Sequence, residues 1–280
     1  MGPTPGDDRG SGHAYAFSDG AVASRRLARL AAVFEPATRA LFADLAPGPR
    51  PVVVDLGCGP GHTTRLLAEL LPGSVVTGLD ASEAFLAEAA AVPGRRWRFA
   101  RADVTGPLPG DRADLVYARF LLVHLPEPEE AVARWADHLA PGGLLVVEEA
   151  DAIETDDPDF SRYLELAAVA VADAGGDLGA GRLLREMAAA PDRTVVWQRR
   201  RALEVTAGAA ATLFSLNLSV FGSSPAVAAV AAPGELAALA GRLAARTAED
   251  DTAVIGWTMG QLVLGRPVVA PTAEVTAPPP

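Results

Sequence analysis

The amino-acid sequence predicts an α/β fold: a doubly wound, mostly parallel sheet of seven strands with helices on both faces. Strand-like and helix-like segments alternate five times within residues 51–151, which is typical of a doubly wound parallel sheet. Two further strand-like runs follow at residues 194–205 and 253–265. Half of the 280 residues are hydrophobic, which is enough apolar material for a core of this size.

The two ends of the chain differ from the middle. Residues 1–20 and 269–280 are rich in glycine, proline and polar residues, so we expect a disordered tail at each end. Residues 21–50 predict a helical cap, because apolar side chains recur at helical spacing over residues 27–34. Pro36 is expected to begin a second helix within this cap.

The first part of the predicted sheet spans residues 51–151. The run VVVDL is wholly apolar apart from its aspartate, as expected for a strand buried on both faces. Ser82 suits a helix N-cap and Pro128 suits a first helical position. The run PGG at residues 141–143 is expected to end the helix that Pro128 begins. The expected strands are 52–56, 74–80, 97–103, 113–119 and 144–151, and the expected helices between them are 64–71, 83–91 and 128–139.

The second part, residues 152–268, has a looser pattern. Helices are expected at residues 160–174 and 182–190, and alanine-rich helical segments are expected from residue 207 to residue 247. We expect residues 51–268 to form one domain. Its first part would hold a ligand, and its second part would complete the sheet and cover the site as a lid.

Composition and charge exclude several kinds of partner. The formal net charge is −11 and no basic stripe reverses it, which argues against nucleic acid. No apolar run is long enough to predict a membrane span. Cys58 is the single cysteine, so no intrachain disulfide can form. The N-terminus has no basic start followed by an apolar core, so no secretory signal is expected and a cytoplasmic location is the simplest interpretation.

A glycine-rich loop follows the first predicted strand. Ligands of parallel α/β sheets bind beyond the carboxyl ends of the strands, where glycines let a ligand approach the backbone. The helix that follows points its positive end to the same place. A dinucleotide-binding loop needs a third glycine at residue 62, where the chain has His62. The glycines instead fall at Gly57, Gly59 and Gly61.

The run DLGCGPG at residues 55–61 resembles the first motif of the class I S-adenosylmethionine-dependent methyltransferases. Asp80 ends the second predicted strand, Asp103 ends the third, and PGG precedes the fifth, as in that family. The resemblance implies a Rossmann-like fold and S-adenosyl-L-methionine as the cofactor, with S-adenosyl-L-homocysteine as its product. It covers residues 50–150 closely, and the helical N-terminal portion and the GRP run at residues 265–267 resemble small-molecule members of the family more loosely.

The resemblance also implies roles for single residues. The loop would wrap the amino-acid part of the cofactor, Asp80 would accept hydrogen bonds from the ribose hydroxyls, and Asp103 would accept one from the adenine amino group. Arg26 is either a partner of the methionine carboxylate or a solvated helix arginine, and Cys58 is interpreted as a small filler. The predicted cofactor-binding residues are Arg26, Asp55, Gly57, Cys58, Gly59, Gly61, Asp80, Ala81, Asp103, Val104 and Arg119.

Methyl transfer from a sulfonium is an in-line displacement that needs a base only if the acceptor must lose a proton. His124 is the candidate base, since its ordinary pKa near 6.5 suits proton removal; the alternative is a structural histidine. Glu148, Glu149 and Asp151 form an acidic cluster after the fifth strand that could bind a substrate, deprotonate it or ligate a metal. His13 and His138 do not complete a ligand set by spacing, so no metal is expected. The candidate acceptor-binding residues are Tyr15, Phe17, Phe120, Glu149, Asp151, Tyr163 and Phe214.

These observations together predict an enzyme that methylates a small organic acceptor on oxygen, nitrogen or carbon. One alternative is an S-adenosylmethionine-binding protein with a regulatory or non-methylating role. A less favoured alternative is an NAD(P)-dependent oxidoreductase, against which His62 argues. The sequence leaves the acceptor unidentified and the oligomeric state open between a monomer and a homodimer.

Overall fold

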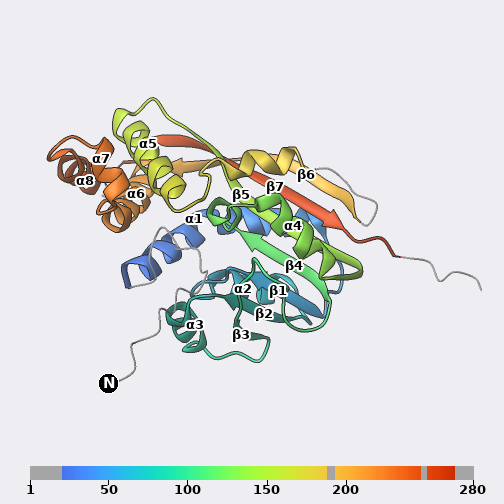
Figure 1. Cartoon of the computed structure of the whole chain (residues 1–280). Helices are drawn as coiled ribbons and strands as arrows, with labels where there is room; N and C mark the ends of the chain where they lie inside the picture. Colours follow the sequence, from blue (N-terminus) through green and yellow to red (C-terminus); the bar gives the residue numbers. More distant parts are fainter. Residues whose placement is uncertain (1–20, 188–192, 247–250, 269–280) are drawn as a thin grey trace, which may run out of the picture.

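The computed structural model describes residues 21–187, 193–246 and 251–268. Within these residues, seven strands form one sheet in the order β3-β2-β1-β4-β5-β7-β6 (Figure 1). The tails expected at residues 1–20 and 269–280 lie outside the described residues. The strands are β1 (Val52–Leu56), β2 (Val75–Asp80), β3 (Trp97–Arg101), β4 (Ala113–Arg119), β5 (Leu139–Glu154), β6 (Thr194–Thr206) and β7 (Val254–Gly265).

Helices surround this sheet. The α-helices are α1 (Ala21–Leu45), α2 (His62–Leu70), α3 (Glu83–Ala90), α4 (Pro128–Asp137), α5 (Pro158–Asp173), α6 (Ala207–Phe221), α7 (Pro225–Val230) and α8 (Glu235–Ala245). Two 3₁₀ helices are η1 (Leu122–His124) and η2 (Ala180–Arg185). Among the described helices, none combines the length and the apolar composition that a membrane crossing requires.

The strand directions confirm a mixed, mostly parallel sheet. Strands β1 to β5 pair in parallel, whereas β7 pairs antiparallel with both β5 and β6. The chain leaves β1 toward β2 and β3 on one side and returns to β4 and β5 on the other. The connections therefore diverge at the boundary between β1 and β4, which is where open α/β sheets form a ligand crevice.

Alternating side chains of the strands cover the two faces of the sheet. On one face, Val53, Val76 and Leu115 pack with apolar residues of α1 and α2, such as Leu41 and Leu67. On the other face, alternate residues of the strands pack against α4 and η2. The apolar cluster on this second face includes Val54, Val116, Leu145, Val147, Trp135 and Leu184.

Helix α1 corrects one sequence-based expectation. Pro36 lies inside a continuous helix of 25 residues and does not begin a second one. A proline in a helix interior removes one backbone hydrogen bond and strains the helix. Tertiary contacts compensate here: Thr38 is fully buried and donates to Glu148 Oε2 at 2.7 Å, beside the Tyr117 hydroxyl. This polar contact anchors α1 to β4 and β5.

The PGG run lies elsewhere than expected. Helix α4 ends at Asp137 and β5 begins at Leu139, so residues 141–143 lie inside β5. They fall where the register of β4 against β5 shifts between Ala113 and Leu115. The extra residues on the β5 side are absorbed by an irregularity in the strand, where glycine is tolerated.

The helix expected at residues 182–190 is also corrected. A short 3₁₀ helix, η2, occupies Ala180–Arg185, and residues 188–190 lie outside the described part of the chain. Gly181 sits so close to β5 that a Cβ atom there would overlap the carbonyl oxygen of Ala150. Helix η2 therefore packs directly on the strand through a residue without a side chain.

The second half of the chain completes the sheet and adds a helical layer. Figure 1 shows α5, α6, α7 and α8 gathered beyond one end of β5 and β7. Helix α6 packs against α1, α5 and α8. A third apolar cluster forms there from α1, α5, α6, α8 and β7, including Phe34, Phe160, Phe214, Leu239 and Trp257.

Candidate functional site

A cavity of about 740 Å³ opens at the carboxyl ends of the parallel strands. The segments after β1, β2, β3 and β4 line it on one side, and α1, α5, α6 and β7 line it on the other. The predicted site residues on its wall are Arg26, Gly57, Cys58, Gly59, Asp80, Ala81, Asp103, Val104, Arg119, Phe120, His124, Glu149, Tyr163 and Phe214. Asp55, Gly61 and Asp151 are not on the wall, and Tyr15 and Phe17 lie outside the described residues.

The glycine loop has a backbone that other residues rarely adopt. The φ angles of Gly57, Gly59 and Gly61 are 62°, 51° and 80°. Such positive angles are strained for residues with a Cβ atom. A Cβ atom on Gly57 would also lie 2.9 Å from the Leu121 side chain. The three alternating glycines of the sequence thus correspond to three left-handed positions in one tight loop.

Asp55 supports the loop from behind. It is buried, and its Oδ2 accepts hydrogen bonds from the hydroxyls of Thr63 and Thr64, both at 2.6 Å. Burial raises the pKa of its carboxyl to about 6, although these two hydrogen bonds oppose the rise. Asp55 therefore joins β1 to the start of α2. The sequence predicted that Asp55 contacts the cofactor directly, but Asp55 does not line the cavity and instead supports the loop.

Gly61 likewise serves the junction. It is the N-cap residue of α2, and a Cβ atom there would lie 2.6 Å from the Phe99 ring. The residue brings the helix close to β3 and does not reach the cavity wall.

Two carboxylates stand at the strand ends beside the loop. Asp80 accepts hydrogen bonds from the backbone N–H groups of Gly59 and Ser82, both at 2.8 Å. Asp103 accepts from the N–H group and the hydroxyl of Thr105, at 2.9 and 2.6 Å. These contacts fix the orientation of both carboxylates at the wall of the cavity. We call this part of the cavity, bounded by Gly57, Gly59, Asp80 and Asp103, the loop end.

The turn after β4 carries the candidate base. Phe120 has a φ angle of 55°, an uncommon value for a residue with a side chain. Glu149 Oε1 accepts hydrogen bonds from the N–H groups of Leu121 and Leu122, at 2.7 and 2.6 Å. Glu149 thereby fixes the turn that leads to His124. Burial raises the pKa of Glu149 to about 8, and the two hydrogen bonds oppose this.

His124 lies on η1 and faces the cavity. Burial among protein atoms lowers its pKa to about 3, and the charge of Arg26 acts in the same direction. The imidazole is therefore neutral at neutral pH and is a weaker proton acceptor than a histidine in water. The expectation of an ordinary pKa near 6.5 is corrected by this environment.

Arg26 and Arg119 also line the cavity. Arg26 of α1 is almost fully buried, so the description of a solvated helix arginine is wrong. Arg119 ends β4 and donates to the Thr38 hydroxyl at 3.1 Å.

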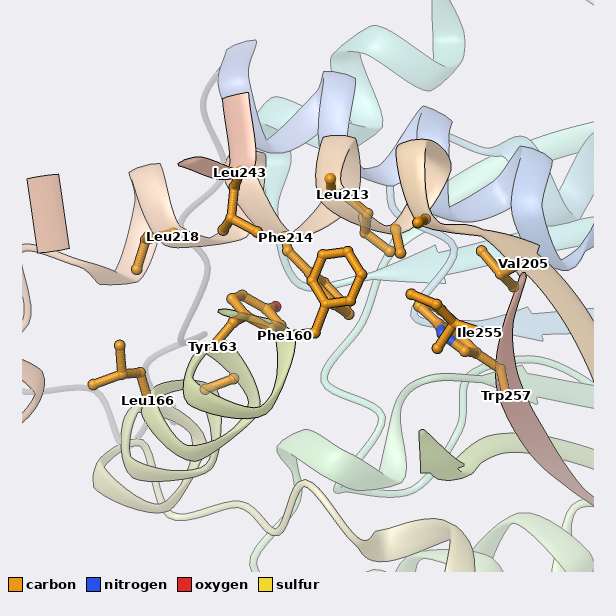
Figure 2. Close-up of a cluster of buried hydrophobic side chains, with 14 of the residues drawn as sticks. Phe160, Tyr163, Leu166, Val205, Leu213, Phe214, Leu218, Leu243, Ile255 and Trp257 are labelled. Carbon is orange, nitrogen blue, oxygen red and sulfur yellow. The ribbon is translucent and has the colours of Figure 1, made fainter. Parts of the chain in front are cut away.

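Five aromatic side chains line that inner part of the cavity: Phe34, Phe120, Tyr163, Phe214 and Trp257, which we call the aromatic wall. Phe214 lies between Tyr163 and Trp257 (Figure 2), with ring centroids 3.9 Å and 5.8 Å away and nearly parallel planes. Phe34 lies 5.4 Å from Trp257 and 4.5 Å from Phe120, centroid to centroid. The rings thus form a continuous series. We call the part of the cavity that they line together with His124 and Glu149 the inner chamber.

Sequence reasoning missed Phe34, Trp257 and Asn217 as cavity residues. Phe34 and Trp257 have the spacing of core residues on a helix and a strand, and both are indeed buried. Asn217 lies in the alanine-rich segment, where the pattern identifies no site. Its polarity amid apolar residues was the one available signal.

Asp151 corrects another expectation. It is buried beside η2 and pairs with Arg200 of β6 and with Arg185, the latter at 3.4 Å. The register of β5 against β7 shifts between Ala150 and Ala152 at this position. With two guanidinium partners, its carboxylate has a structural role and does not line the cavity. In the described ranges, no group of three or more His, Cys, Asp and Glu side chains is arranged to hold a metal ion.

Comparison with known proteins agrees with this geometry. Residues 54–145 match the family model described as a methyltransferase domain. A trans-aconitate 2-methyltransferase of Paracidovorax citrulli is 41% identical over 134 residues, which is 46% of this chain and 50% of that enzyme. The enzyme of the same name from Mycobacterium tuberculosis strain H37Ra is 40% identical over 103 residues, 37% of this chain and 38% of that enzyme. The matched part of the chain thus spans half of the length of the first relative and 38% of the length of the second.

Solved structures share the fold. The cyclopropane synthase MmaA2 of Mycobacterium tuberculosis has a TM-score of 0.51 at 20% identity, covering 80% of this chain and 82% of that chain. A coclaurine N-methyltransferase has a TM-score of 0.51 at 15% identity, covering 82% of this chain and 70% of that chain. The glycine loop and the two carboxylates at neighbouring strand ends lie within residues 54–145, the part of the chain that is similar to a methyltransferase domain.

Proposed function

We propose that this protein transfers a methyl group from S-adenosyl-L-methionine to a small organic acceptor. One observation carries the proposal: the residues of the loop end and those of the inner chamber line one and the same cavity. A nucleophile held in the chamber and a cofactor held at the loop end would meet inside the protein. Holding two reactants in line at short range is the main requirement of this reaction.

The residues of the loop end fit the cofactor. Positive φ angles at Gly57 and Gly59 leave a bare backbone that a ligand can approach closely. Asp80 would accept hydrogen bonds from the ribose hydroxyls and Asp103 from the adenine amino group, with Val104 and Ala81 beside the rings. Arg26 and Arg119 would pair with the methionine carboxylate, because guanidinium groups suit carboxylates. Cys58 is a buried, small part of the loop; burial raises its pKa, so it stays a thiol.

When bound, the cofactor supplies the electrophilic methyl group and a good leaving group. The chain has to orient the acceptor, exclude water and accept a proton where the acceptor carries one. His124 is neutral and faces the inner chamber, so it is available as that proton acceptor. Glu149 positions the turn of His124 through the Leu121 and Leu122 N–H groups.

The segments before and after the cofactor-binding part would cover the cavity. Residues 21–50 form a cap, since Arg26 and Phe34 of α1 lie on the cavity wall. Residues 152–268 complete the sheet and supply a lid through α5 and α6, which contribute Tyr163 and Phe214 to the same wall. A cytoplasmic location and the choice between a monomer and a homodimer stay predictions.

Titration calorimetry with S-adenosyl-L-homocysteine tests the binding half of the proposal. We expect one site per chain. Release of S-adenosyl-L-homocysteine from S-adenosyl-L-methionine in the presence of an acceptor tests the transfer half. Folded protein that binds neither compound would overturn the proposal, and binding without release for any acceptor would leave a cofactor-binding protein with another role.

A further inference from the structure

The inner chamber differs from the loop end in chemistry. Its wall is made mainly of rings and aliphatic side chains from α1, α5, α6 and β7, and its polar side chains are His124, Glu149 and Asn217. Phe34, Tyr163, Phe214 and Trp257 are each less than 5% exposed and pack ring to ring. A wall whose rings hold one another in place presents a fixed apolar surface to a ligand.

The inner chamber disfavours both negatively and positively charged groups. Burial raises the pKa of Glu149 to about 8 and lowers that of His124 to about 3, so both groups favour their neutral forms. Moving a carboxylate from water into such surroundings is costly unless a cation meets it. A ligand with several carboxylates would therefore need several cationic partners.

The cavity wall offers few such partners. Its arginines are Arg26, Arg101 and Arg119. Arg101 lies at the end of β3, on the adenosine side, and pairs with Glu83 at 2.6 Å. The proposed function assigns Arg26 and Arg119 to the methionine carboxylate. No further cation of the described residues lines the cavity for the carboxylates of an acceptor.

Two polar groups interrupt the apolar wall. Asn217 donates through Nδ2 to the Tyr163 hydroxyl at 2.5 Å, and its Oδ1 atom has no hydrogen-bond partner in the described residues. Turning the amide over would satisfy Oδ1 and leave Nδ2 without a partner, so one of its polar atoms stays unsatisfied in either orientation. The indole N–H of Trp257 also has no partner within the described part of the chain. Buried polar atoms without partners cost about 1–3 kcal/mol each.

From this arrangement we infer that the acceptor is a neutral, mainly apolar, ring-containing molecule that lies along the aromatic wall and hydrogen-bonds to Asn217 and Trp257. The inference rests on the proposed function and narrows its substrate class. It separates this chain from the relatives named for trans-aconitate, a tricarboxylate. An acceptor hydroxyl or carbonyl would satisfy the orphaned polar atoms, and its rings would replace water against the aromatic side chains.

The test uses the full chain saturated with S-adenosyl-L-homocysteine. Calorimetric titrations with 2-naphthol and 4-phenylphenol, two neutral ring compounds with one hydroxyl, are compared with a titration with trans-aconitate. We expect both ring compounds to bind, and trans-aconitate to bind at least about tenfold more weakly. Tighter or equal binding of trans-aconitate, or no binding of either ring compound, would overturn the inference.

Three variants locate the binding. Trp257→Phe keeps a ring and removes the N–H donor, and Asn217→Leu removes the amide; each should weaken the better ring compound by about three- to tenfold. Trp197→Phe is the matched control, because Trp197 lies on β6, stacks on Arg199 at 4.0 Å and is not on the cavity wall. Unchanged binding in both cavity variants would overturn the inference. The affinity for S-adenosyl-L-homocysteine is measured in the parent chain and in every variant. A parent chain that does not bind S-adenosyl-L-homocysteine would refute the proposed function. A parent chain that binds it but does not show the expected binding of the ring compounds would refute only the acceptor class.

Discussion

The Oε1 atom of Glu149 lies 2.7 Å from the backbone nitrogen of Leu121, and this hydrogen bond ties β5 to the turn after β4. A second bond to the Leu122 nitrogen closes the same turn. The carboxyl of Glu149 thus connects β5 to the turn that follows β4. Because this carboxyl is buried and its pKa is raised in the folded protein, its protonation is coupled to folding.

Glu149→Gln should therefore change how stability depends on pH. The folded-state pKa is raised from 4.5 to about 8, so the folded protein binds this proton more tightly than the unfolded chain. Protonation of Glu149 therefore adds to the free energy of unfolding below pH 4.5, and this addition is lost as the pH rises toward 8. The loss is at most on the order of 5 kcal/mol. Glutamine can still accept both N–H bonds and has no such titration. Relative to the parent, the variant should become more stable between pH 5 and pH 8, as measured by urea unfolding. A pH-independent difference would show that Glu149 does not titrate in this range.

Asp80→Ala should weaken the binding of S-adenosyl-L-homocysteine by about 100-fold, if two hydrogen bonds from the ribose to a charged group are lost. Asp173→Ala is the control, since Asp173 is an exposed acid at the end of α5. Calorimetry measures both affinities. Asp80 also holds Gly59 and Ser82, so thermal unfolding is followed in parallel. Unchanged affinity in a folded Asp80→Ala variant would remove the ribose role.

Gly61→Ala and Gly73→Ala should separate backbone strain from steric overlap. Both glycines have positive φ angles, of 80° and 93°, so both variants pay a strain of about 1 kcal/mol. Only Gly61 faces a side chain: its added Cβ would lie 2.6 Å from the Phe99 ring, whereas Gly73 has open space. We expect Gly61→Ala to cost about 1–3 kcal/mol more than Gly73→Ala in urea unfolding. Adding Phe99→Leu should recover part of that excess, and equal costs for the two glycine variants would contradict the close packing of α2 on β3.

His124→Asn should lower kcat by about 100-fold and leave the affinity for S-adenosyl-L-homocysteine within about twofold, if His124 accepts a proton from the acceptor. Because burial lowers its pKa to about 3, the parent should lose no activity through protonation of His124 between pH 6 and pH 8. A pH–rate profile of both proteins checks this. An acidic limb near pH 6.5 that disappears in His124→Asn would mean that the imidazole is better solvated during turnover than the cavity indicates. Full activity in the variant would return His124 to a structural role.

The fold and the loop end followed from the sequence because their causes are local. Three glycines at alternate positions need no distant partner to require left-handed backbone, and acids at the ends of strands β2 and β3 stand together once parallel strands pair. Alternation of apolar runs and amphipathic helices was enough to predict the seven strands. Pro36 was misassigned because the tertiary contacts of α1 overcame a local helix-breaking signal. Residues 141–143 were misassigned because pairing with β4 extends β5 through them, with an irregularity in the register.

The inner chamber was decided by tertiary structure. Glu149 and Asp151 are two residues apart on one strand, yet η2 and two arginines enclose Asp151 while Glu149 reaches the cavity. Phe34, Phe214 and Trp257 come from segments far apart in the chain and look like ordinary core residues in each segment. The pKa of His124 depends on the groups that enclose it and not on its neighbours in sequence. Local patterns specify which backbone can form, whereas burial and charge in a site arise only when distant segments meet.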